Sequence, residues 1–103
     1  MFGSRKSKNA LEPPPIAETN PKAVEVLRVW AVPGEPQQLS LLTTWRDPGA
    51  WGLLLADVAR HAAEAYRREG HDPKVVLTRI RQALEAEWSD STDVPTDLSG
   101  KPS

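Results

Sequence analysis

The dipeptide Asp-Pro occurs twice in the chain, and each copy precedes a run with helical periodicity. The first copy, Asp47-Pro48, precedes "GAWGLLLADVARHAAEAYRREG", and the second, Asp72-Pro73, precedes "KVVLTRIRQALEAEW". An aspartate carboxylate can accept hydrogen bonds from the free amides of a first helical turn, and proline fits the first helical position because its missing N–H costs nothing there. Gly70 lies between the runs, where glycine favours a helix end. The segment from Asp47 to Trp88 therefore predicts two antiparallel helices.

Each expected helix has one apolar stripe, which should be its buried side. In the first helix the stripe contains Trp51, Leu54, Leu55, Val58, Ala62, Ala65 and Tyr66. In the second helix it contains Val76, Leu77, Ile80, Leu84 and Trp88.

The segment before the helices predicts an antiparallel β-hairpin. "AVEVLRVWAV", residues 23–32, is rich in β-branched and aromatic side chains, which favour strands. "PGEP" follows, with Pro33-Gly34 suited to the central positions of a type II turn. "QQLSLLTTW", residues 37–45, alternates between apolar and polar side chains, as a strand with one buried face does.

The expected fold class is α+β: a β-hairpin followed by two antiparallel helices packed on one of its faces, in the order β-β-α-α, with disordered tails. The first strand is apolar on both faces, and an isolated two-stranded hairpin is barely stable in water. A homodimer that joins sheets edge to edge, or stacks their outer faces, would cover what the helices leave open. Leu27, Val29 and Ala31 are the candidate interface residues. The alternative is a monomer whose leader covers the sheet.

Composition divides the chain into three parts. Residues 1–22 are polar and contain "EPPP", which predicts a flexible proline-rich leader. Alternatively, "NALEPPPI" lies across the domain, with Leu11 and Ile16 as anchors. Residues 23–88 form the single small α+β domain, and residues 89–103 have the composition of a disordered acidic tail.

Charge and cysteine content exclude several classes of function. Between Lys22 and Glu87 nine basic side chains balance nine acidic ones, so no basic face for nucleic acid is expected. The chain has no cysteine, which excludes disulfides, thiolate zinc sites and cysteine nucleophiles. No apolar run approaches the roughly 18 residues of a membrane span, and no secretory signal follows the basic start. We expect a cytoplasmic protein that does not bind membranes.

The residues that most resemble a chemical site are Asp57, His61 and Glu64 on the first helix. At about 100° of rotation per residue they line one strip with Arg68. The three could hold a divalent metal such as zinc or manganese, or Asp57 could orient His61 as a general base. The simpler interpretation, which we favour, is the solvated margin of a buried helix, where pairs at i,i+4 stabilise only slightly.

Four tryptophans, at positions 30, 45, 51 and 88, are many for a chain of 103 residues. They could form a stacking platform or ligand pocket, but each lies on an apolar stripe, so a core or dimer interface explains them more simply. Four arginines, at positions 60, 67, 79 and 81, could form an anion-binding patch, although neighbouring glutamates dilute it.

Motifs typical of enzymes are absent: the chain has no glycine-rich phosphate loop, no G-x-S-x-G elbow and no paired-histidine zinc motif. We therefore expect no cofactor and favour a non-enzymatic, self-associating interaction or accessory domain. The alternative is a ligand- or metal-binding protein that uses the Asp57, His61 and Glu64 strip.

Two stretches, "AVEVLRVWAV" and "DPGAWGLLLADVARHAAEAYRREG", together with the leader "NALEPPP", resemble a family of short bacterial proteins catalogued only as a domain of unknown function. The resemblance covers roughly Asn9 to Trp88. It implies a small α+β domain in the bacterial cytoplasm. It implies no activity, so it transfers no role to any residue.

Overall fold

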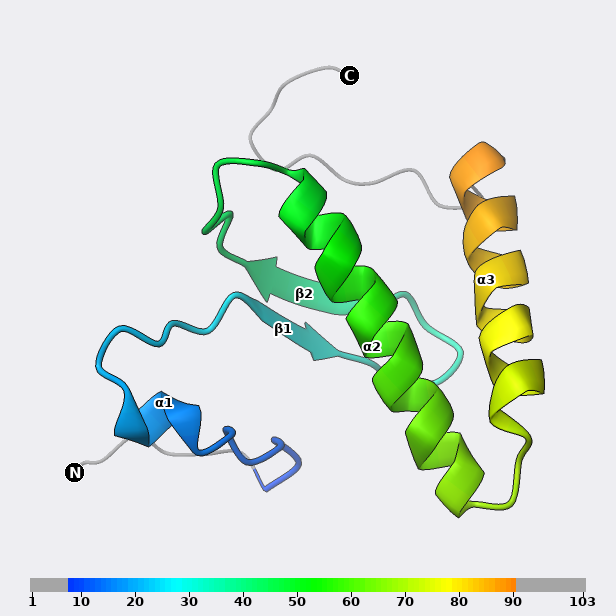
Figure 1. Ribbon diagram of the computed structural model, residues 1–103, viewed down its shortest axis with the longest axis horizontal. Helices are drawn as coiled ribbons and strands as arrows, with labels where there is room; N and C mark the ends of the chain where they lie inside the picture. Colours follow the sequence, from blue (N-terminus) through cyan, green and yellow to red (C-terminus); the bar gives the residue numbers. More distant parts are fainter. Residues whose placement is uncertain (1–7, 91–103) are drawn as a thin grey trace. The chain divides into compact units, whose positions relative to one another are not determined.

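The computed structural model describes residues 8–90 of the chain. Its elements are α1 (Ile16–Thr19), β1 (Leu27–Trp30), β2 (Gln38–Leu41), α2 (Gly49–Arg68) and α3 (Pro73–Ser89), shown in Figure 1. They form two compact units that divide between Arg46 and Asp47, and each unit is described separately below. We call their described parts the hairpin unit, residues 8–46, and the helical unit, residues 47–90. The predicted order β-β-α-α is confirmed, after one short helical turn that the sequence did not predict.

In the hairpin unit, β1 and β2 pair antiparallel through the turn predicted at Pro33-Gly34. The amide of Glu35 donates to the carbonyl of Val32 at 2.9 Å, and Gly34 has a φ of +91°. A positive φ at the third turn residue, after a proline whose ring keeps φ negative at the second, is the pattern of a type II turn and requires a residue that tolerates it. The predicted turn type is therefore confirmed.

Both strands are shorter than their apolar patterns. β2 ends at Leu41, although the alternation continues to Trp45. Thr44 has a φ of +59°, and its hydroxyl donates to the carbonyl of Leu42 at 2.8 Å. This left-handed residue is incompatible with a continuing strand, and β1 can be no longer than the partner that pairs with it.

α1 lies within the segment that was expected to be a flexible leader. Its amides at Ala17 and Glu18 donate to the carbonyls of Pro14 and Pro15, so the prolines begin a helical turn without needing an N–H of their own. Leu11 and Ile16, the anchors of the alternative arrangement, are 92% and 54% exposed, and that arrangement stays a prediction.

In the helical unit both predicted caps form. An Asp47 carboxylate oxygen accepts from the amide of Gly49 at 2.8 Å, and Asp72 accepts from the amide of Lys74 at 2.9 Å. The end of α2 is equally well defined, since Gly70 has a φ of +100° and the amide of His71 donates to the carbonyl of Tyr66. This is a Schellman ending.

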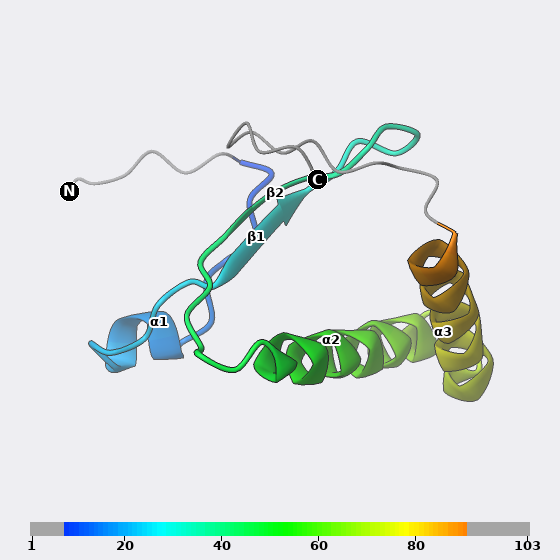
Figure 2. The ribbon, with the colours of Figure 1, turned by 90° about the horizontal axis from the view of Figure 1, so that it is seen from above.

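α2 and α3 contact each other, run in opposite directions from the turn between them, and splay apart with distance from it, as Figures 1 and 2 show. Ala63 on α2 is 2% exposed and is the only buried residue among those the structure describes. On α3, Val76, Leu77 and Ile80 are half-buried. Leu84 and Trp88 were predicted to be buried, but they are 48% and 79% exposed, and they lie near the end of α3 where the two helices are splayed apart (Figure 1). Neither helix is long and apolar enough to cross a bilayer, and no other helix in residues 8–90 is.

Candidate functional site

The strip on α2 brings two of its three candidate ligands together. His61 Nε2 lies 3.5 Å from a carboxylate oxygen of Asp57, one helical turn earlier, as the i,i+4 spacing predicts. The two side chains are 78% and 64% exposed, so water competes for both. An exposed pair of this kind stabilises a helix slightly and does not create an enclosed site.

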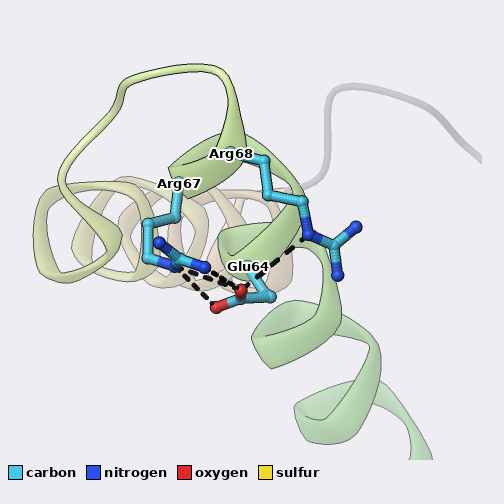
Figure 3. Close-up of polar contacts among 3 residues, drawn as sticks. All are labelled: Glu64, Arg67 and Arg68. Carbon is cyan, nitrogen blue, oxygen red and sulfur yellow. Dashed lines mark hydrogen bonds and ion pairs between the residues drawn. The ribbon is translucent and has the colours of Figure 1, made fainter.

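The third candidate ligand, Glu64, has a different partner. Arg67 donates to both carboxylate oxygens of Glu64, with its Nη2 at 2.6 Å from one of them, and Arg68 approaches at 3.9 Å (Figure 3). The hydrogen bond from Arg67 holds the pKa of Glu64 below its ordinary value, and the same contact raises the pKa of Arg67. The strip is therefore an ion-pair cluster in which Glu64 faces guanidinium groups.

A metal site requires several donors that converge on one point. Within residues 8–90, no group of three histidine, aspartate or glutamate side chains has that arrangement. His71, the second histidine, lies in the interhelical turn and makes an edge-to-face contact with Tyr66, with ring centroids 5.4 Å apart. Metal binding by Asp57, His61 and Glu64 stays a prediction that this geometry does not support.

The hairpin register creates a continuous apolar face, which we call the apolar hairpin face. Leu27 pairs with Leu41 and Val29 pairs with Leu39, and directly paired residues project from the same side of a sheet. Val29, Leu39 and Leu41 are 50%, 57% and 54% exposed, while Leu27 is half-buried. Two candidate interface residues, Leu27 and Val29, thus join two leucines of the other strand. Ala31, the third candidate, is exposed and lies beyond the end of β1.

The opposite side of the hairpin is mainly polar. Arg28 pairs with Ser40, and Trp30 pairs with Gln38. Arg28 also forms a two-pronged ion pair with Glu25, with nitrogen–oxygen distances of 2.9 and 3.0 Å. The hairpin is therefore amphipathic, although the first strand alone is apolar on both faces.

The helical unit exposes apolar surface as well. α3 contacts the side of α2 that carries Ala63, so part of the predicted stripe is left open: Leu55, Val58 and Tyr66 on α2 are each almost half exposed. Contact with α3 alone therefore does not bury these three side chains.

Sequence analysis did not include Leu39 and Leu41 among the interface residues. Their alternation with Gln38 and Ser40 was visible, but the face that they share with β1 depends on the register. A shift of one residue would have placed them beside Arg28 and Trp30 instead. Trp30, Trp45 and Trp88 are exposed, so the described residues do not bury these three in a core, and their place in a dimer interface stays a prediction.

A family model and a solved structure match this chain. The family model described as "Domain of unknown function (DUF5076)" matches residues 10–92. A solved structure described as "a putative pyruvate dehydrogenase from the photosynthetic bacterium Rhodopseudomonas palustrus CGA009" is 38% identical, with a TM-score of 0.70 over 94% of this chain and 96% of that chain. No curated protein matches the chain. The fold and the matched residues together show that the chain belongs to the DUF5076 family of domains of unknown function.

Proposed function

We propose that this protein is a non-enzymatic, self-associating domain that serves as an interaction or accessory module, with the apolar hairpin face at the centre of its association. The observation that carries the proposal is the register that collects Leu27, Val29, Leu39 and Leu41 on one side of a two-stranded sheet. Large apolar side chains concentrated in one exposed patch mark an interaction surface more often than scattered ones do.

The energetics of the hairpin unit support this proposal. An isolated two-stranded sheet is marginally stable at best in water, and it gains stability from further strands or from packing against a helix. None of the residues that the structure describes in the hairpin unit is buried. Burial of apolar surface is the main favourable term in association, so a second copy of the chain would supply what one hairpin lacks.

The solved relative is described as a pyruvate dehydrogenase, a name that would imply catalysis on a 2-oxo acid. Decarboxylation of such an acid needs an electron sink, supplied by a cofactor, in a site that excludes water. Within the described parts of either unit no polar or charged side chain is buried, and the candidate strip on α2 is solvated. These features support an accessory role over that chemistry. The cytoplasmic setting expected from the sequence stays part of this proposal.

The direct test is the mass of the protein in solution. Light scattering or sedimentation at micromolar concentration should give twice the chain mass of 11.4 kDa. The thermal midpoint should also rise with protein concentration, since association stabilises only the folded chain. A monomer whose midpoint does not depend on concentration would refute self-association.

The alternative, metal binding by the strip on α2, is favoured by one observation, the Asp57–His61 contact. Zinc or manganese titration followed through the ring NMR signals of His61 tests it separately. We expect unchanged signals at stoichiometric metal, because the Glu64 carboxylate is paired with Arg67. Shifts that saturate at one metal per chain, and vanish in Asp57→Asn, would establish the alternative instead.

A further inference from the structure

We infer that two copies of the chain join along the free edge of β2, in an antiparallel register centred on Ser40, to form a four-stranded sheet. This inference deepens the proposed function and rests on it. The sheet has two strands in the described part of the chain, so β1 and β2 each present one edge that pairs with no strand there.

The hydrogen bonds of the hairpin determine which residues point outward. The amide of Leu42 donates to the carbonyl of Val26 at 3.0 Å, so these two residues are a hydrogen-bonded pair. Hydrogen-bonded and non-hydrogen-bonded pairs alternate in an antiparallel ladder. The pair Arg28 and Ser40 is therefore bonded inward, whereas the backbone groups of Leu39 and Leu41 point to the outer edge of β2.

One register of two β2 strands uses both of these outward-facing residues. It places Leu39 of one copy opposite Leu41 of the other, with Ser40 opposite Ser40 on the twofold axis. Because directly opposed residues share a face, the apolar hairpin faces of both copies then form one surface. This surface has eight apolar side chains on four strands, and a sheet of three or more strands with a hydrophobic face is more stable in water than an isolated hairpin.

The other free edge, that of β1, is unsuitable for the same arrangement. The outward-facing residues of β1 are Leu27 and Val29, and the register that uses both places Arg28 opposite Arg28 on the axis. Like charges directly opposed across strands are destabilising, and a charged residue is a common means of protecting an edge strand. β2, with the sequence Gln-Leu-Ser-Leu, contains no charge. Charge therefore favours β2 as the strand that associates.

The chain contains no cysteine, so one introduced cysteine can form a disulfide only between copies. Ser40 and its counterpart on the axis form a non-hydrogen-bonded pair, because the backbone groups of Ser40 are bonded inward to Arg28. The two Cα atoms of such a pair are about 4.5 Å apart, within the range that a disulfide spans. The matched controls are Gln38→Cys, about 13 Å from its counterpart along the strands, and Arg28→Cys, about 14 Å from its counterpart across the sheet. Both controls lie on the same polar face of the hairpin as Ser40.

Under mild oxidation at micromolar concentration, we expect Ser40→Cys to form a covalent dimer on the order of 100-fold faster than either control. The two Ser40→Cys thiols of one dimer lie side by side, at millimolar effective concentration, whereas the control thiols lie too far apart within a dimer to react there. Circular dichroism of the reduced variants confirms that each is folded. Two outcomes would refute association through the β2 edge and leave self-association intact. One is faster cross-linking of Arg28→Cys than of Ser40→Cys. The other is equal cross-linking rates for all three variants while the mass of the protein is that of a dimer. A monomeric mass for the unmodified chain would instead overturn the proposed function.

Discussion

The two units of this protein differ in how far each completes its own hydrogen bonding and packing. In the helical unit, Asp47 and Asp72 cap the helix starts, Gly70 ends α2, and Ala63 is buried where α3 contacts α2. In the hairpin unit a type II turn closes the ladder, yet each strand has one free edge within the described residues, and the apolar hairpin face is exposed.

The difference indicates where the need for a partner is greatest. Local hydrogen bonds can complete a helix, because every turn pairs with the next, whereas a strand can be completed only by another strand. The two units should therefore respond differently to substitution: changes in the hairpin should alter association, and changes in the helices should alter stability without altering it.

The largest expected effect comes from a charge on the apolar hairpin face. Leu39→Asp should raise the dimer dissociation constant about 100-fold, or about 3 kcal/mol, because two carboxylates per dimer would each lie directly opposite Leu41 of the other copy and lose part of their hydration there. Sedimentation over a dilution series measures the constant. Gln38→Asp adds the same charge to the same strand on the polar face, and it should change the constant much less. Equal effects of the two variants would contradict the assignment of the faces.

The next effect tests the helical unit. Ala63→Leu should lower the free energy of unfolding by about 1–3 kcal/mol, because the contact between α2 and α3 has no room for three more carbons. Ala56→Leu adds the same atoms seven residues earlier at an exposed position and should change stability by no more than about 0.5 kcal/mol. Urea unfolding at constant protein concentration compares them. A dissociation constant that rises for Ala63→Leu would show that association depends on the helices as well.

The same contrast between local and nonlocal structure explains what the sequence predicted. The helix starts, the helix end and the hairpin turn depend on neighbouring residues, and all were predicted at or within one residue of where they lie. The strand ends were not predicted, since the left-handed backbone of Thr44 has no simple sequence signal. The exposure of Trp88 was also missed, because it depends on how widely the two helices splay.

The candidate site on α2 shows the limit of reasoning from spacing. Helical geometry predicted the approach of His61 to Asp57, and it also placed Glu64 on the same strip. It did not predict the partner of Glu64, because Arg67 and Arg68 compete for its carboxylate from the next turn. Which charged side chains pair on an exposed strip is decided by rotamers, and sequence spacing does not specify them.

The third effect compares the two glycines with positive φ, one in each unit. Gly34→Ala and Gly70→Ala should each cost about 1–2 kcal/mol, because a positive φ strains a residue with a Cβ. The added Cβ would meet no atom within 4 Å at either position, so no steric clash adds to this cost. Gly52→Ala, at a helical position that also has open space, should instead stabilise by about 1 kcal/mol. Only Gly34→Ala should also weaken association, because its turn holds the strand that associates. Thermal unfolding at two protein concentrations separates these outcomes. If the loss of thermal stability in Gly70→Ala depended on protein concentration, the helical unit would also take part in association, contrary to this prediction.

The smallest effect concerns the ion pair between Glu64 and Arg67. Because Arg67 lowers the pKa of Glu64 in the folded chain, the pair stabilises the fold fully above the unfolded-state pKa of the carboxyl group, and this stabilisation is lost as the pH falls through the lower folded-state pKa. The stability difference between the natural chain and Glu64→Gln should therefore shrink as the pH is lowered from 7 to 3. Arg67→Gln should abolish the same pH-dependent difference, and added salt should reduce it, because both side chains are solvated. Since the pair lies entirely within α2, neither variant should change the dimer dissociation constant. A change in that constant would place this strip, rather than the hairpin, in the interface.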